Sequence, residues 1–84
     1  MVAHSNTFHI TIASVGESRF DSEVVSVTLP GAAGEFTILP QHEPLVTTLK
    51  KGIITVRTSK EDSQQFEVEG GVVECSGNRA VVLL

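Results

Sequence analysis

The sequence has no tryptophan, no tyrosine and a single cysteine. Without tryptophan or tyrosine, the chain lacks the stacking platforms on which most carbohydrate-binding modules depend. One cysteine, Cys75, cannot form an intramolecular disulfide, so the core must hold together without a covalent staple. These absences fit a small domain that works in a reducing compartment.

Basic residues are also scarce. Six Lys and Arg face ten Asp and Glu, for a net charge of −4, and only Lys50 and Lys51 are adjacent. Because phosphate backbones are bound by clustered cations, no nucleic-acid partner is expected. No apolar run exceeds five residues, far below the ~20 that span a bilayer, and the N-terminus has no secretory signal pattern. We therefore expect no direct insertion into a membrane, and any association with one must go through another protein.

What the sequence does have is β-branched side chains. Of its 84 residues, 25 are Val, Ile or Thr, which fit a pleated sheet better than a helix because their χ1 angle is restricted. The length allows a single domain, residues 1–84, with a thin margin of stability. Strand is therefore the favoured state throughout.

Apolar and polar residues alternate along most of the chain, the pattern of strands with one face in a core. No stretch has the helical spacing that an amphipathic helix requires. Turns are expected at Gly16, Lys50 to Gly52, Ser59 to Gln64, Gly70-Gly71 and Gly77-Asn78. The predicted strands are centred on Phe8 to Ile12, Phe20 to Leu29 as one longer strand, Phe36 to Ile38, Leu45 to Leu49, Ile54 to Val56, Phe66 to Val68, Val73 to Cys75 and Ala80 to Leu84. Eight or so short strands predict an all-β fold, an antiparallel sandwich or barrel.

The residues that could carry chemistry form no known motif. The histidines His4, His9 and His42 lack metal-binding spacing, and no glycine-rich phosphate loop is present. Cys75 occupies an inward position of its strand, which favours a small buried hydrophobe over a nucleophile. We expect no catalytic residue, no metal and no cofactor.

Two loop residues stand out. His42 lies between Pro40 and Pro44, which restrict the backbone around it, and Glu35 follows the glycine-rich turn at Gly34. From local chemistry alone, His42 is a capping side chain and Glu35 a solvated charge.

The segment Gly34 to Leu49, with Gly34-Glu35, Pro40, His42 and Pro44, resembles the G-E-x-x-[IV]-x-P-x-H-x-P-[LF] loop of ATP synthase epsilon subunits. Segments Lys51 to Ile54 and Glu69 to Glu74 resemble the turns that follow, and the resemblance covers Thr7 to Leu84. It implies a flattened β-sandwich of about ten strands. It also implies a non-catalytic central-stalk subunit of an F-type ATP synthase, which couples the gamma subunit to the c-ring on the cytoplasmic side of the inner (plasma) membrane.

Residue roles follow from the same resemblance. The family's loop glutamate falls on Glu35, which is expected to contact the c-ring, with Thr47 and Thr48 as an extension of that edge. The loop histidine falls on His42, which is expected to contact the gamma subunit. The chain departs from the pattern at Gln41, where glycine or asparagine is common, and at Glu43, where alanine is common.

Many members of the family continue into a C-terminal helical hairpin that inhibits hydrolysis, whereas this chain stops at Leu84. The expected fold therefore has no such hairpin, and its regulatory roles are not assigned to this chain. Both a naturally short chain and a truncated one fit the sequence. In isolation the uncovered gamma-binding face is expected to allow a homodimer. Two alternatives stay open: a ligand-binding module, and a stand-alone enzyme in which His9, His42 and Glu43 or Glu35 converge.

Overall fold

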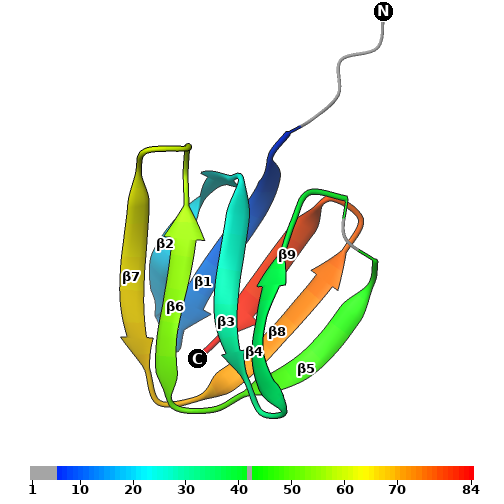
Figure 1. Ribbon diagram of the computed structural model, residues 1–84. Coiled ribbons are helices and arrows are strands. Elements are labelled where there is room, and N and C mark those ends of the chain that lie inside the picture. The colour runs from blue at the N-terminus through cyan, green and yellow to red at the C-terminus, as the bar shows by residue number, and fades with distance from the viewer. Residues whose placement is uncertain (1–5, 42) are drawn as a thin grey trace, which may run out of the picture.

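A computed structural model describes residues 6–41 and 43–84, and every regular element within them is a β-strand (Figure 1). No helix in those residues is long and apolar enough to cross a membrane. The strands are β1 (Phe8–Ser14), β2 (Glu17–Val24), β3 (Ser26–Gly31), β4 (Gly34–Ile38), β5 (Leu45–Leu49), β6 (Gly52–Arg57), β7 (Ser63–Val68), β8 (Gly71–Ser76) and β9 (Arg79–Leu83).

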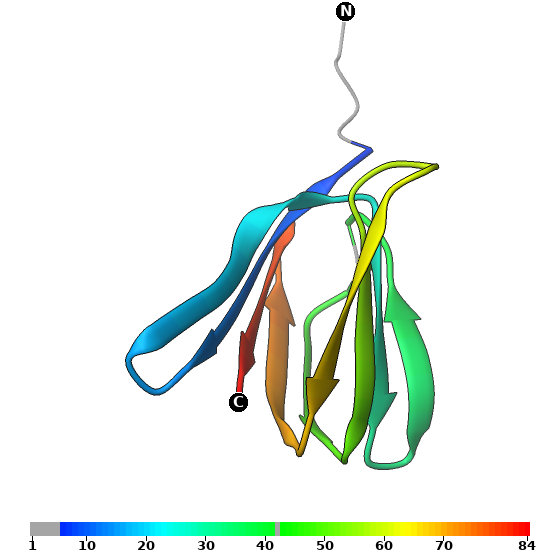
Figure 2. The same cartoon turned by 90° about the vertical axis from the view of Figure 1, so that its left-hand side faces the viewer.

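One continuous sheet folds over into two layers. The strand order is β2-β1-β9-β8-β5-β3-β6-β7, with β4 beside β3. Figure 2 shows β2, β1, β9, β8 and β5 on one side, which we call the first layer, and β4, β3, β6 and β7 on the other, the second layer. The two are joined where Gly31 of β3 pairs with Leu49 of β5. This arrangement confirms the predicted β-sandwich.

The core between the layers follows the alternation seen in the sequence. In β1, for example, Phe8, Ile10 and Ile12 are buried while the residues between them are partly exposed. Cys75 is buried as predicted, and burial raises the pKa of its thiol, which disfavours the reactive thiolate. The buried apolar side chains are those of Phe8, Ile10, Ile12, Val24, Val27, Leu29, Ile38, Leu49, Ile54, Val56, Val68, Val73, Cys75, Ala80 and Val82.

The two ends of the strand order meet through aromatic side chains. Phe20 of β2 and Phe66 of β7 lie edge to face, with ring centroids 5.8 Å apart and an interplanar angle of 68°. Edge-to-face pairs place the positive ring edge against the negative ring face, which stabilises them beyond the area they bury. Side-chain contact therefore closes the sandwich where no backbone ladder joins β2 to β7.

The predicted long strand from Phe20 to Leu29 is wrong, because it is two strands. β2 ends at Val24 and β3 begins at Ser26, and the N–H of Val25 between them donates to the Arg57 carbonyl over 2.7 Å. Val24 and Val27 are both buried, so the period of two shifts by one residue here. The chain crosses from the first layer to the second at this point, and the alternation of inward and outward residues starts anew in β3.

One pairing is not antiparallel. β1 and β9 run parallel, with His9 opposite Arg79 and Ala13 opposite Leu83. Parallel neighbours need a long connection, and here the whole of the intervening chain supplies it. Alternation along a strand fixes which side chains point inward but carries no information on strand direction, so the sequence did not reveal this pair.

Candidate functional site

The β3–β4 turn presents Glu35 at one end of the sandwich. Gly31 pairs with Gly34 across a two-residue turn, and Glu35 is exposed just beyond it. A Cβ atom at Gly31 would lie 2.7 Å from the Gly34 carbonyl oxygen and 2.8 Å from the Phe36 ring, so only glycine fits. The N–H of Ala32 donates to the Thr48 carbonyl over 3.0 Å, which holds the turn against β5.

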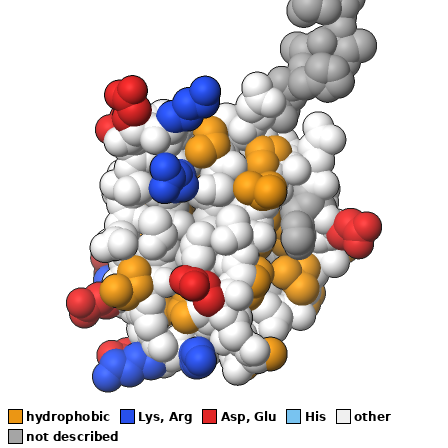
Figure 3. Space-filling model, viewed as in Figure 1, with side chains coloured by type: hydrophobic (Ala, Val, Ile, Leu, Met, Phe, Trp, Pro, Cys, Tyr) orange, Lys and Arg blue, Asp and Glu red, His pale blue; other side chains and the backbone are white. Residues whose placement is uncertain are grey.

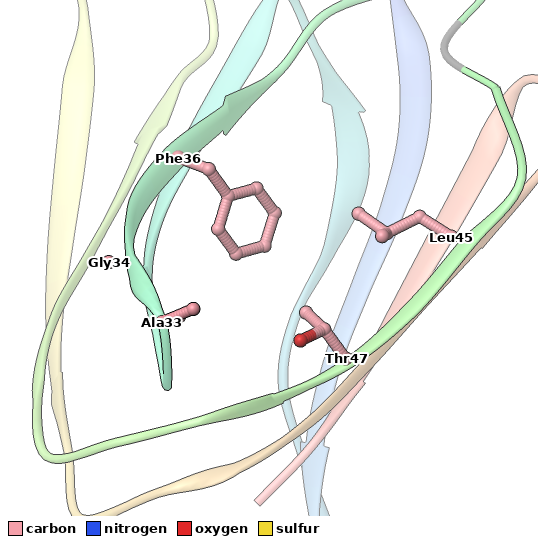
Figure 4. Close-up of a pocket in the computed structure, with 6 residues that line it drawn as sticks. Ala33, Gly34, Phe36, Leu45 and Thr47 are labelled. Atoms are coloured by element: carbon pink, nitrogen blue, oxygen red, sulfur yellow. The ribbon is translucent and has the colours of Figure 1, made fainter.

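A cleft of about 130 Å³ lies beside this turn, between β4 and β5. Figure 4 shows Phe36 from β4 and Leu45 and Thr47 from β5 directed toward the space between the two strands. Gly31, Ala33 and Gly34 also line it, and none of the described residues of the lining is charged. The cleft suits an apolar group.

The structure divides the two threonines that were predicted to share one edge. Thr47 is half-buried and lines the cleft, whereas Thr48, the next residue of β5, is exposed. Successive residues of a strand point to opposite faces, so a single flat partner surface meets only one of these side chains fully. Thr47 shares its side of β5 with the Glu35 turn.

The loop between β4 and β5 lies at the opposite end of β4 from that turn (Figure 1). His42 is outside the described residues, but its neighbour Gln41 is well defined. The N–H of Gln41 donates to Asn78 Oδ1 over 2.8 Å, and Asn78 Nδ2 donates to the Thr7 carbonyl over 2.7 Å. Asn78 therefore ties this loop to the first strand and to the β8–β9 turn.

The sequence predicts Asn78 as a turn residue, and its cross-links depend on long-range geometry. The sequence carried a partial indication of the unusual backbone at Gln41, because the family that it resembles often has glycine or asparagine at this position. Gln41 has a φ of 61°, the left-handed conformation that those two residues tolerate best.

Replacing Gln41 with glycine is expected to raise the free energy of unfolding by about 0.5–1 kcal/mol, because glycine adopts a left-handed φ without steric cost. Urea unfolding followed by circular dichroism measures the change. Gln41→Ala is the matched control and should bring no gain, since alanine carries the same strain. A glycine variant less stable than the parent would contradict this account.

Among the residues of the possible enzyme site that the structure describes, His9 and Glu35 do not converge. His9 lies on the outer face of the first layer beside Asp21 and Glu23, whereas Glu35 lies on β4 of the second layer. His4 and His42 are outside the described residues. Within residues 6–41 and 43–84, no three side chains of metal-ligand type are grouped to hold an ion.

The two outer faces of the sandwich differ in polarity. On the first layer, Val46, Val72 and Leu83 are 68%, 40% and 57% exposed, and Val72 pairs with Leu83. On the second layer, Thr28 and Thr37 share a hydrogen bond of 2.9 Å. Figure 3 shows that the surface over β6, β3 and β4 is mostly uncharged polar side chains and backbone. The second layer also exposes Leu39 after β4 and Ile53 of β6, at 56% and 46%, but on the first layer the three exposed apolar side chains lie on the neighbouring strands β5, β8 and β9.

Comparison with known proteins places these features in a family. Residues 7–84 match the family described as "ATP synthase, Delta/Epsilon chain, beta-sandwich domain". An ATP synthase epsilon chain of Chlorobium limicola is 36% identical over 83 residues, which cover 99% of this chain and 94% of the relative. One of Delftia acidovorans is 37% identical over 78 residues, 93% of this chain but 56% of the relative. The chain thus spans nearly all of the first relative and about half of the second.

Solved structures share the fold. A chain of the Euglena gracilis mitochondrial ATP synthase, in a structure of OSCP, F1 and c-ring, superposes with a TM-score of 0.88 at 20% identity, over 98% of this chain and 52% of that one. A chain of the Tetrahymena thermophila mitochondrial ATP synthase central stalk and c-ring gives 0.74 at 16% identity, over 89% and 60%.

Proposed function

Because the chain belongs to the ATP synthase Delta/Epsilon β-sandwich family, we propose that it is a non-catalytic central-stalk subunit that couples the gamma subunit to the c-ring of an F-type ATP synthase. The observation that carries the proposal is that the loops on either side of β4 lie at opposite ends of this strand (Figure 1). The β3–β4 turn leads into β4, whose second residue is Glu35, and the loop with His42 in its sequence follows the strand. A connector between two partners needs such a two-ended arrangement.

The strand between the two contacts is stiffly supported. β4 pairs with β3 along its whole length, from Gly31 opposite Gly34 to Val27 opposite Ile38. Ile38, Val27 and Leu29 are fully buried beneath that ladder. Close-packed interiors transmit strain, so a load applied at the turn reaches the far loop with little deformation.

In this proposal Glu35 contacts the polar loops of the c-ring, Thr47 extends that contact with its side chain, and Thr48 supports it through the backbone. His42 contacts gamma. The Ala32–Thr48 hydrogen bond supports the first part, because it brings the end of β5 to the Glu35 turn. The anchored Gln41 supports the second, because it fixes the backbone next to His42.

The location follows from the partners. A subunit held between gamma and the c-ring lies at the periphery of the inner (plasma) membrane, on its cytoplasmic side. The exposed Val46, Val72 and Leu83 support self-association of the isolated chain as a homodimer, since an uncovered apolar face favours such contacts.

Pull-down experiments with purified gamma subunit and with c-ring test the assignment. Glu35→Ala is expected to weaken c-ring binding about fivefold to tenfold while gamma binding stays, because one polar contact at an interface is worth about 1 kcal/mol. His42→Ala is expected to weaken gamma binding instead. Glu61→Ala, at the exposed tip of the β6–β7 hairpin, is the matched control and should change neither.

If the folded parent chain bound neither gamma nor the c-ring, the resemblance would extend to the fold alone and the proposed function would be wrong. If Glu35→Ala and Glu61→Ala behaved alike, the coupling role would stand but the role of Glu35 would not.

A further inference from the structure

A cross-strand cluster surrounds His9 on the outer face of the first layer. Nε2 of His9 contacts the Asp21 carboxylate, and Nδ1 lies 3.2 Å from Glu23 Oε2. Both acids lie on β2, where Glu23 is directly opposite His9. On the other side of β1, Arg79 of β9 is at the same register. Among the described residues, the charged groups in contact with the His9 ring are therefore the two carboxylates, and Arg79 is the charged residue at its register on β9.

The geometry determines the protonation state of the ring. A carboxylate only accepts hydrogen bonds, and a neutral imidazole has a single N–H to donate. Since both ring nitrogens of His9 face carboxylate oxygens, these contacts favour the doubly protonated ring, an imidazolium. Loss of one proton would leave a nitrogen lone pair facing a carboxylate, and one of the two contacts would be lost.

The cluster is joined to the loop that precedes His42. Thr7 Oγ1 donates to Glu23 Oε1 over 2.8 Å, and the Thr7 carbonyl accepts from Asn78 Nδ2. Asn78 also accepts from the N–H of His9 through its carbonyl, over 3.2 Å, and from the N–H of Gln41 through Oδ1. A chain of direct hydrogen bonds thus leads from the β2 carboxylates through Thr7 and Asn78 to Gln41.

We propose that the His9 imidazolium, held between Asp21 and Glu23, is a proton-sensitive clamp that sets how firmly the Gln41 loop is anchored through Thr7 and Asn78. When His9 loses its proton, the Glu23 carboxylate is no longer held in place. The hydrogen bond from Thr7 to Glu23 then weakens, and Asn78 holds Gln41 less tightly. That a looser Gln41 loop weakens gamma binding rests on the function proposed above, whereas the clamp itself does not depend on that function.

The pH range of the clamp follows from the two pKa directions. Hydrogen bonds to Asp21 and Glu23 raise the pKa of His9 above its ordinary 6.5, so its contribution is complete below pH 6.5 and is lost as pH rises through the raised pKa. The hydrogen bond from His9 lowers the pKa of Asp21 below 3.8, so its contribution is complete above pH 3.8 and is lost as pH falls through the lowered pKa. The clamp is therefore fully formed between these two values.

Nuclear magnetic resonance of the isolated chain tests the clamp without any partner, so its failure is distinct from a failure of the proposed function. The His9 ring is expected to titrate with a midpoint above 6.5, and Asp21→Asn should lower that midpoint. The Gln41 amide shift is expected to follow the same midpoint. The ratio of the Gln41 amide exchange rate at pH 8 to that at pH 6 is then compared between two proteins. This ratio should be on the order of twofold to fivefold larger in the parent chain than in a His9→Gln variant, in which residue 9 cannot titrate.

Two further variants separate the clamp from its connection to the loop. Thr7→Val removes the hydroxyl that bonds Glu23, and it should leave the His9 titration in place while weakening the response of Gln41. His9→Lys keeps a positive charge across the range and should abolish the pH response of Gln41. A His9 midpoint at or below 6.5, or a Gln41 amide that does not follow His9, would overturn the proposal.

Discussion

Replacing Ile54 with alanine is expected to lower the free energy of unfolding by about 3–4 kcal/mol. Ile54 is fully buried in β6 and pairs with Phe66, so truncation removes buried methyl groups and leaves a cavity. Domains of this size are stable by only about 5–15 kcal/mol in total, so the loss would remove a large share of the margin. Because the chain has no tryptophan or tyrosine, far-UV circular dichroism in urea is the suitable measurement.

The neighbouring residue supplies a matched control of the same type. Ile53 points to the outer face and is 46% exposed. Ile53→Ala is expected to cost about 0.5–1 kcal/mol, since the residue is only partly removed from water. Equal losses from the two variants would show that β6 is buried on both faces and would contradict the sandwich.

Gly71→Ala is expected to destabilise the chain by about 2–4 kcal/mol, from backbone strain together with a steric clash. Gly71 has a φ of 148°, and a Cβ atom there would lie 2.5 Å from the Leu83 carbonyl oxygen of the neighbouring strand. The clash would push β9 away from β8 at the point where Val72 pairs with Leu83. The same urea titration measures the loss.

Gly34→Ala separates the two causes. Gly34 has a similar φ of 141° but nothing lies within 4 Å of the added Cβ, so only the backbone strain of about 1–2 kcal/mol applies. The Gly71 variant should therefore be the less stable of the two by at least about 1 kcal/mol. If the two variants lost the same free energy of unfolding, β9 would have to move away from β8 at no energetic cost, which would contradict the steric argument.

The local features of the fold could be predicted because they depend on neighbouring residues. The alternation of Phe8, Ile10 and Ile12 identified β1 and its buried face, and the pair Gly70-Gly71 marked the break before β8. The parallel pairing of β1 with β9 could not be predicted in this way, because it joins residues about 70 apart with no local signal. The strand break at Val25 was hidden by apolar residues that continue through it.

The candidate site was only partly predictable for the same reason. Glu35 was expected at an exposed turn, and it is exposed. Thr47 and Thr48 are successive residues of a strand, so their side chains point to opposite faces. The resemblance placed both on one edge because it considered only their positions in the sequence. The contacts of Asn78 with Gln41 and Thr7 depend on three segments that meet only in the folded chain.

The position of β9 has a consequence for synthesis on the ribosome. β9 lies between β1 and β8, so β1, the first of the described strands to leave the exit tunnel, takes one of its two partners from the last of them. The growing chain can pair β1 with β2 early, but the other edge of β1 stays open until residues 79–83 emerge. Contacts so distant in sequence make folding slow, and open edges favour aggregation meanwhile. The first layer therefore cannot close until β9 has emerged, and until then chaperones have an open strand edge to shield.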